Sequence, residues 1–463
     1  MQKLQVITGL LAIGMAAPSQ EKAAAPFLSI VTSFTSTTKA ASHTKAEAPD
    51  VNGAVGPAHI VEFLNGDVKV YDKKTRQLVL SKTTREFWEG VPGSGGAEAN
   101  PDNKDPRLIW DHLARRWYTS AQRPNGTVGD STLIIGRSDT EDPTRGWKAV
   151  TFFGDKDKTP RTFVDFDQLG VSRDAVLLSI NQFKVGENNR PMVDGVEIFA
   201  IKKSDLNLPT PVLTMVRLDH LIDWRGVVPA VDYDGTTVAG TFWGTSSEKT
   251  EKNEVMVRGD VTGDHEKWDL KRVTARVGDK PPNTLRKGLF PRPMLPQPEG
   301  KEVSSNGTTP PAVRLIKGEF WMVHATRHPD DDKRSVLRWW RIRASDNAVL
   351  GDGLLSDPEL NLFLPSIAVD GNGNIAIGCV GASAKQFLSA YAIGGKIVNG
   401  RAVFDPSFQM VKAGLGVHAA NGRWGDYTTT VADPTEPGTF WTFLPWAQAN
   451  GEWATEIAKL AVK

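Results

Sequence analysis

The chain has 463 residues with a formal net charge of +1, and it combines 14 Trp with 43 Gly. This near-neutral balance gives no electrostatic reason to expect nucleic acid or an anionic membrane as a partner. No linker-like change of composition divides the chain, so one large repeat array is the simpler interpretation. We expect the protein to be a monomer.

The N-terminus has the features of an export signal. A Lys at position 3 is followed by an apolar stretch over residues 4–17 and then by small residues. The stretch is too short to span a bilayer, so we expect residues 1–25 to be a signal peptide. A buried N-terminal helix is the alternative. If residues 1–25 are a signal peptide, we expect the protein to be secreted, periplasmic or at the cell surface, and residues 26–463 to form a single domain. The one cysteine, Cys379, is expected to be a small buried side chain.

A pair of apolar, strand-like runs recurs seven times along the chain. Such a period, rich in β-branched and aromatic residues, is typical of a radial β-repeat. The first runs of the pairs are 59–65, 116–122, 175–181, 236–243, 319–327, 374–383 and 439–446.

Each unit can be completed to four strands by a segment before the pair and an outer run after it, with no internal helix. This pattern predicts an all-β fold, a seven-bladed β-propeller with four-stranded antiparallel blades. The last unit lacks an outer strand, and residues 27–35 near the N-terminus are expected to supply it and so close the ring. A two-sheet sandwich is the alternative, but it normally holds fewer strands.

Loop lengths distinguish the two faces of such a propeller. Turns between the first and second strands are tight, for example DGNGN at 370–374. Loops between the second and third strands are long and polar, and we expect the excursion at 277–312 to reach the same face. Long loops on one face of a rigid scaffold usually form the binding site.

Four aspartates near the starts of first strands should crowd one side of the channel mouth: Asp50, Asp105, Asp165 and Asp426. Three interpretations remain open. The carboxylates could bind a hard cation such as Ca²⁺, or two of them could act as acid and base in glycoside hydrolysis. Alternatively, each could cap its local turn, with Arg423 neutralising one of them.

Basic, amide and aromatic residues form a second group of ligand-binding candidates. Arg327 and Arg423 could clamp anions, because a guanidinium binds carboxylates through two hydrogen bonds. Trp424 offers a face for stacking on a sugar ring. Asn181 and Tyr427 complete this group. The sequence has no zinc-binding HExxH, nucleophile elbow, P-loop or Rossmann glycine pattern, so no catalytic residue can be assigned.

Segments including PDVNGAVGPAHIVEFLN (49–65), LPSIAVDGNGNIAIG (364–378) and RWGDYTTTVADPTEPGTFW (423–441) resemble a family of large secreted bacterial β-propeller proteins. The resemblance covers about residues 49–458, and RWGDY is its most specific part. It implies a secreted propeller that shares only its architecture with sialidases, whose S-x-D-x-G-x-T-W turns this chain lacks.

We expect recognition, with or without processing, of a glycan or other extracellular polymer at the long-loop face. A non-catalytic protein-interaction scaffold at the cell surface is the alternative.

Overall fold

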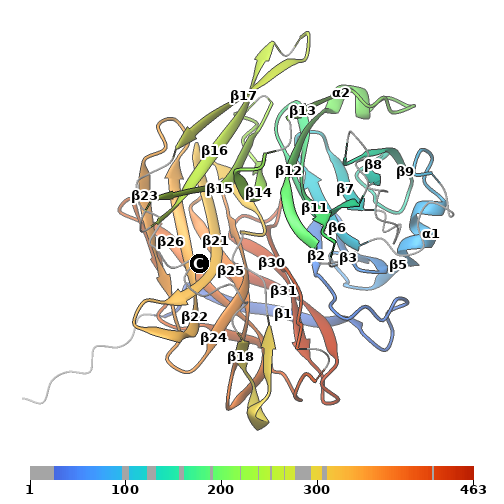
Figure 1. Ribbon diagram of the computed structural model, residues 1–463. Coiled ribbons are helices and arrows are strands. Elements are labelled where there is room, and N and C mark those ends of the chain that lie inside the picture. The colour runs from blue at the N-terminus through green and yellow to red at the C-terminus, as the bar shows by residue number, and fades with distance from the viewer. Residues whose placement is uncertain are drawn as a thin grey trace, which may run out of the picture.

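The computed structural model describes residues 25–463 except 96–103, 123–131, 156–160, 188–190, 219–220, 238, 251–252, 265, 277–293, 305–309 and 420–421. The expected signal peptide therefore lies outside the described residues apart from Ala25. The described chain is built almost wholly from β-strands (Figure 1). Within it, no helix has both the length and the apolar composition needed to cross a bilayer.

Several four-stranded antiparallel sheets make up the molecule, which confirms the expected all-β class at that level. The first sheet contains β2 (Asn52–Val55), β3 (His59–Leu64), β4 (Asp67–Asp72) and β5 (Leu78–Thr83). The second contains β6 (Lys104–Asp111), β7 (Arg116–Gln122), β8 (Thr132–Ser138) and β9 (Trp147–Phe153).

Three further sets of antiparallel strands are joined into one twelve-stranded sheet. They are joined because the first strands of the sets pair in parallel, β10 with β14 and β14 with β20. The strands are β10 (Thr162–Val171), β11 (Ala175–Val185), β12 (Pro191–Lys202), β13 (Met215–Leu218), β14 (Trp224–Asp232), β15 (Thr241–Thr250), β16 (Asn253–Asp264), β17 (Asp269–Arg276), β20 (Val313–Ile316), β21 (Glu319–His328), β22 (Asp331–Arg343) and β23 (Val349–Leu355).

The C-terminal part of the chain forms two more sheets. One holds β24 (Asn361–Val369), β25 (Asn374–Ser383), β26 (Gln386–Val398), β27 (Arg401–Phe404) and β28 (Gln409–Lys412). The other holds β29 (Thr429–Ala432), β30 (Thr439–Ala447), β31 (Trp453–Val462) and the N-terminal strand β1 (Leu28–Thr38). β1 pairs with β31 from Leu28 opposite Val462 to Thr38 opposite Ala454, so the N-terminal run does supply the missing outer strand.

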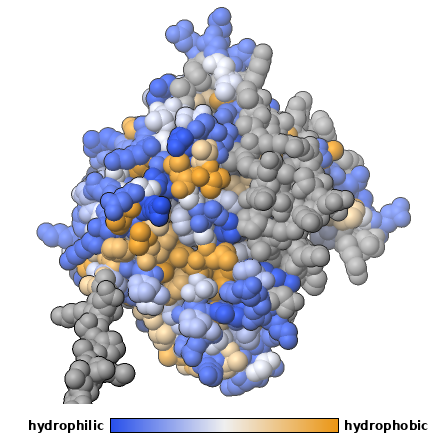
Figure 2. Space-filling model, turned by 90° about the vertical axis from the view of Figure 1, so that its left-hand side faces the viewer, coloured by the Kyte–Doolittle hydropathy of each residue, from blue (hydrophilic) through white to orange (hydrophobic). Residues whose placement is uncertain are grey.

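Aromatic and branched side chains fill the space between neighbouring sheets. Trp117 of the second sheet is fully buried, and its ring lies against Gly56 of the first sheet, where a Cβ would come within 2.6 Å of it. Cys379 is buried in β25, as expected. Figure 2 shows apolar side chains scattered among polar ones over the face that is on the left in Figure 1. Exposed apolar residues of the outer strands β23, β27 and β28 include Val349, Val403 and Met410.

Three expectations about local structure were wrong. Several polar segments expected as loops continue the strands as hairpin arms, because the backbone ladder persists through polar residues: β21 ends at His328 and β22 resumes at Asp331. The strand expected at 236–243 begins at Thr241, since the Asp232 carboxylate accepts hydrogen bonds from the N–H and hydroxyl of Thr237 and holds a longer turn.

The third wrong expectation concerns helices, because the repeat was expected to contain none. The described chain has α1 (Thr84–Glu89), α2 (Lys203–Leu206) and a 3₁₀ turn, η2 (Pro298–Gly300). A reciprocal capping box starts α1: the Thr83 hydroxyl accepts from the N–H of Glu86, and the Glu86 carboxylate accepts from the N–H of Thr83. The Thr-x-x-Glu spacing is a readable sequence signal for this helix start. The helix buries Phe87 and Trp88 against the first two sheets.

Candidate functional site

A left-handed backbone residue recurs where the first strands begin. Asp50, Asp105, Phe166 and Leu364 have φ angles of 45°, 50°, 63° and 46°. The strand pairing shifts register beside three of them, between 104 and 107, 165 and 168, and 363 and 366. Gly226 and Gly425 have φ angles of 54° and 134° at the corresponding places. Such bulges redirect side chains away from the regular in-and-out alternation of a strand.

Beside two of these bulges, those at Asp105 and Phe166, lies an open cavity of about 450 Å³, which we call the acidic cavity. It is lined by Asp50, Asp105, Asp165, Asp426, Arg423, Asn65 and residues 44 and 46–48. One carboxylate oxygen from each of Asp50, Asp105 and Asp426 lies within 4.8 Å of the others. The structure therefore brings all four predicted aspartates together, although they are up to 376 residues apart in sequence.

Amide groups hold these carboxylates in place. The Asn65 side chain donates to Asp50 Oδ2 at 2.7 Å and accepts the N–H of Asp105 at 2.9 Å, so one residue links two aspartates. The Gln122 amide donates to Asp105 at 2.8 Å and to Asp165 at 3.2 Å. Asp50 also accepts the N–H of Asp426 at 2.8 Å. Part of the turn-capping interpretation is thus present, but the bonds that join Asn65 to Asp105, Gln122 to Asp165 and Asp50 to Asp426 cross between sheets.

Burial and mutual repulsion alter the proton affinity of the inner carboxyls. Burial, followed by repulsion from Asp165, Asp50 and Asp426, raises the pKa of Asp105 well above its usual range. Burial also raises the pKa of Asp50, although Arg423 opposes this. Crowded carboxylates of this kind share protons, so the pair formed by Asp50 and Asp105 retains a proton under conditions where an isolated aspartate is ionised.

Arg423 supplies the positive charge of the acidic cavity. Its guanidinium is paired with Asp426. Burial lowers the pKa of Arg423, but the surrounding carboxylates outweigh this effect and raise the pKa above its usual value. The expectation that Arg423 clamps an anionic ligand is therefore not supported by this geometry, because its partner is already a carboxylate. The hairpin of β18 (Met294–Pro296) and β19 (Glu302–Ser304) lies beside this segment, with Ser304 bridged to Arg423.

The other candidates are placed differently. Trp424 is 1% exposed and packs edge-on against His418 with ring centres 4.8 Å apart, so its ring face cannot stack on a sugar. Tyr427, also 1% exposed, lies beneath the carboxylates, and its hydroxyl is 3.3 Å from Asp105. Asn181 lies opposite Asp165 in the β10–β11 pairing. Arg327 lies on β21, outside the lining of the acidic cavity.

Arg107 is a central residue that the sequence interpretation did not select. Its guanidinium carbon lies 3.3 Å from the centre of the Tyr427 ring, and its Nε donates to the Asp167 carbonyl oxygen at 2.8 Å. Its position in the repeat could have marked Arg107, because it stands two residues after the left-handed Asp105, just as Asn52 stands two residues after Asp50. Asp167 is buried beside it, and burial raises its pKa to about 7.

Comparison with known proteins gives distant structural similarity and no family assignment. No family model and no curated protein matches the chain. The structure is similar to Trypanosoma rangeli sialidase in complex with the inhibitor DANA, with 8% identity, a TM-score of 0.38 and coverage of 89% of this chain and 58% of the sialidase. It is also similar to Penicillium chrysogenum alpha-L-arabinanase complexed with arabinobiose, with 10% identity, a TM-score of 0.40 and coverage of 77% and 92%. The chain thus spans little more than half of the sialidase.

Proposed function

We propose that the protein is an exported glycan-binding protein whose acidic cavity recognises hydroxyl and amino groups of a sugar. The observation that carries this proposal is the convergence of four aspartates and one arginine on one open cavity of about 450 Å³. Cavities of this size hold small ligands or a few units of a polymer. An amino sugar is the better ligand class than a uronate, because the carboxylates outnumber the guanidinium.

The proposed scaffold is a closed, seven-bladed propeller. In support, contacts between first strands run from β2 to β6, β10, β14, β20, β24 and β29, and from β29 back to β2. The pairing of β1 with β31 provides a natural closing strand. Such a ring would hold the bulges of neighbouring blades at fixed distances and so preorganise the acidic cavity. Export after removal of residues 1–25 rests on the sequence features of that segment.

Each group of the acidic cavity has a defined part in this proposal. Asp165 and Asp426 would accept hydrogen bonds from sugar hydroxyl or ammonium groups, and such bonds are stronger when one partner is charged. Asp105, which holds its proton more tightly than usual, can also donate one to a ring or hydroxyl oxygen. Arg423 is paired with Asp426 and orients its carboxylate.

A glycan panel tests the proposal. Calorimetric titrations would compare oligomers of glucosamine, N-acetylglucosamine and galacturonate at constant ionic strength. We expect binding in the order glucosamine, N-acetylglucosamine, galacturonate. Tightest binding of galacturonate, or no binding of any sugar while the protein remains folded, would contradict the proposal, and the latter result would favour the scaffold alternative.

Processing is a second candidate, favoured by the proximity of the proton-holding carboxyl of Asp105 to a second carboxyl, that of Asp426. Retaining glycosidases place their two carboxyl groups roughly 5 Å apart. The bound oligomer should then be cleaved, and Asp105→Asn should abolish the release of reducing ends while leaving binding within about threefold. Release at the same rate by the variant would exclude this role for Asp105.

A further inference from the structure

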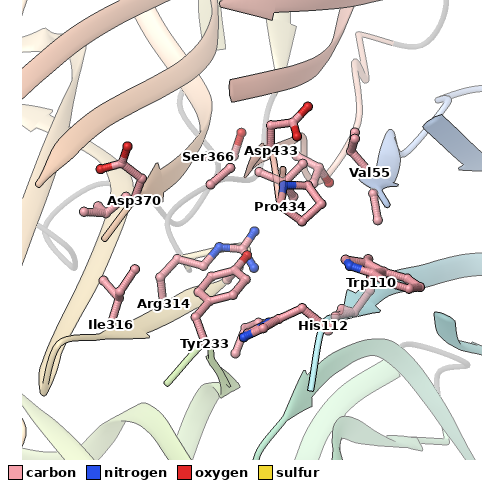
Figure 3. Close-up of a pocket in the computed structure, with 18 of the residues that line it drawn as sticks. Val55, Trp110, His112, Tyr233, Arg314, Ile316, Ser366, Asp370, Asp433 and Pro434 are labelled. Atoms are coloured by element: carbon pink, nitrogen blue, oxygen red, sulfur yellow. The ribbon is translucent and has the colours of Figure 1, made fainter. Parts of the chain in front are cut away.

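A second cavity, of about 400 Å³, lies among the first strands of the sheets, and we call it the central cavity. Its lining includes residues of β2, β6, β10, β14, β20, β24 and β29. It also includes turn residues of the short-loop face, among them His112, Asp234 and Asn372. Figure 3 shows Arg314, Tyr233 and His112 on one side of this space and Ser366, Asp370 and Asp433 on the other.

Two buried cations line the central cavity without an ion-pair partner. Arg107 and Arg314 are 3% and 4% exposed. Among the described residues, their hydrogen bonds go to neutral carbonyl oxygens: Arg107 Nε to Asp167 O at 2.8 Å, and Arg314 to Ile367 O at 3.2 Å and Thr430 O at 3.1 Å. Within the part of the chain that the structure describes, neither forms an ion pair within 4.0 Å, although the charge of Arg107 opposes the rise in the pKa of Asp167 and of Asp105. Buried charges are usually paired, because removing them from water is costly.

Unused hydrogen-bond donors lie in the same wall. Among the described residues, Arg107 Nη2 and the indole Nε1 of Trp110 have no hydrogen-bond partner although both atoms are buried. Both residues line the central cavity. Buried polar groups nearly always have a partner, so these two donors are exceptions. Both atoms are closed to solvent and do not face the open space themselves; the group of this wall that points into the cavity is the guanidinium of Arg314.

The two buried carboxylates of the central cavity do not pair with these cations, because both are already satisfied. Asp370 accepts from the N–H groups of Asn372, Asn374 and Gly438 and from the Asn374 side chain. Asp433 is paired with Lys73 at 2.9 Å and accepts from the Trp441 indole.

We propose that the central cavity is a binding site for a small organic carboxylate with an apolar body. The carboxylate would pair with the guanidinium of Arg314, which points into the cavity in Figure 3, and the charge of Arg107 would assist. The walls fit the apolar part, since they include Val55, Ile109, Val231, Ile316, Val369 and Val431. The half-buried Tyr233 ring, stacked with His112 at 6.1 Å, forms one edge of the entrance. This proposal is independent of glycan binding at the acidic cavity.

Calorimetric titration with benzoate tests the proposal, with benzamide and sulfate as controls at matched ionic strength. We expect benzoate to bind with a dissociation constant of about 1 mM or tighter, and both controls to bind at least roughly tenfold more weakly. Equal binding of benzamide would show that the charge is not recognised. Equal binding of sulfate would show that the apolar walls take no part. Either result, or no binding of benzoate, would overturn the proposal.

Variants locate the binding. Arg314→Gln should weaken benzoate binding at least tenfold, with circular dichroism to verify folding. Because a buried variant can fail to fold, two exposed residues of the entrance provide an independent test. His112→Glu should weaken binding and Asp234→Asn should strengthen it, each by roughly two- to threefold, because each changes the local charge in the opposite sense. Unchanged affinity in both entrance variants would place benzoate elsewhere and overturn the proposal.

Discussion

The guanidinium of Arg107 stacks on the ring of Tyr427, with the guanidinium carbon 3.3 Å from the ring centre, and this pair links the two cavities of the protein. Arg107 lines the central cavity, whereas the hydroxyl of Tyr427 contacts Asp105 in the wall of the acidic cavity. A cation over an aromatic face is attracted by the ring's negative potential, most strongly when both are shielded from water. The charge of Arg107 is thereby stabilised without a carboxylate partner.

Removing the Tyr427 ring should therefore be far more costly than removing its hydroxyl. Tyr427→Ala leaves a cavity and a buried, unstacked guanidinium, and should lower the free energy of unfolding by about 3–5 kcal/mol. Tyr427→Phe keeps the ring and loses one long hydrogen bond, so its cost should stay near 1 kcal/mol or below. Urea denaturation measures both values. Equal losses in the two variants would show that the stacked ring does not stabilise the protein.

Asp167 should make the protein less stable as the pH rises through neutrality. Burial raises its pKa from 3.8 to about 7, so the folded state holds a proton that the unfolded state has lost between these values. Its contribution to stability is therefore fully present below about pH 4 and is lost as the pH rises through about 7. Asp167→Asn removes this titration. Between pH 5 and 7.5, the wild type should lose more of its unfolding free energy than the variant, and parallel losses would contradict the assignment.

Gly425 is required by both its backbone angle and its surroundings. Its φ angle is 134°, and a Cβ would lie 3.3 Å from Asp50 Oδ1, which accepts the N–H of Asp426. Gly425→Ala should lower the unfolding free energy by about 1–3 kcal/mol and weaken glycan binding. Gly400→Ala is the matched control, because Gly400 also has a positive φ angle, 78°, but open space around it. If the control loses sugar affinity to the same extent, the effect of Gly425→Ala is not local to the acidic cavity.

The predicted calcium site can be tested through stability. Asp50, Asp105 and Asp426 offer three oxygen ligands within 4.8 Å of one another, with Asp165 close by, but Arg423 already supplies a positive charge. If Ca²⁺ binds the folded protein, millimolar CaCl₂ should raise the melting temperature and EDTA should reverse the shift. Asp165→Asn should reduce the shift. A melting temperature that responds to neither reagent would exclude calcium.

Strand positions were largely predictable from the sequence, because each strand carries its own pattern of β-branched and aromatic residues. The expected first run at 116–122 coincides with β7, and the expected N-terminal strand at 27–35 lies within a residue of the start of β1. The hairpin arms were missed because polar residues carry no core pattern, although their backbones still pair.

The acidic cavity could be predicted only in part. The position of each aspartate relative to a first strand was enough to bring Asp50, Asp105, Asp165 and Asp426 together. Side-chain direction was not predictable, because the left-handed residues reset it at each bulge. Trp424 consequently faces the core rather than a ligand, and Arg423 faces Asp426. The contacts of Asn65 and Gln122 join distant segments, and no local sequence signal marks them.

Replacement of one carboxylate in the acidic cavity tests the proposed function most directly. Asp165 is half-buried and lines this cavity, so Asp165→Asn removes a charge while preserving the shape of the side chain. Calorimetric titration with a glucosamine oligomer should show roughly five- to tenfold weaker binding than for the wild type, the effect of losing about 1 kcal/mol of attraction. Asp346→Asn, an exposed change on the β22–β23 turn, is the control and should bind as the wild type does. Unchanged affinity in Asp165→Asn would contradict recognition of the sugar by the acidic cavity.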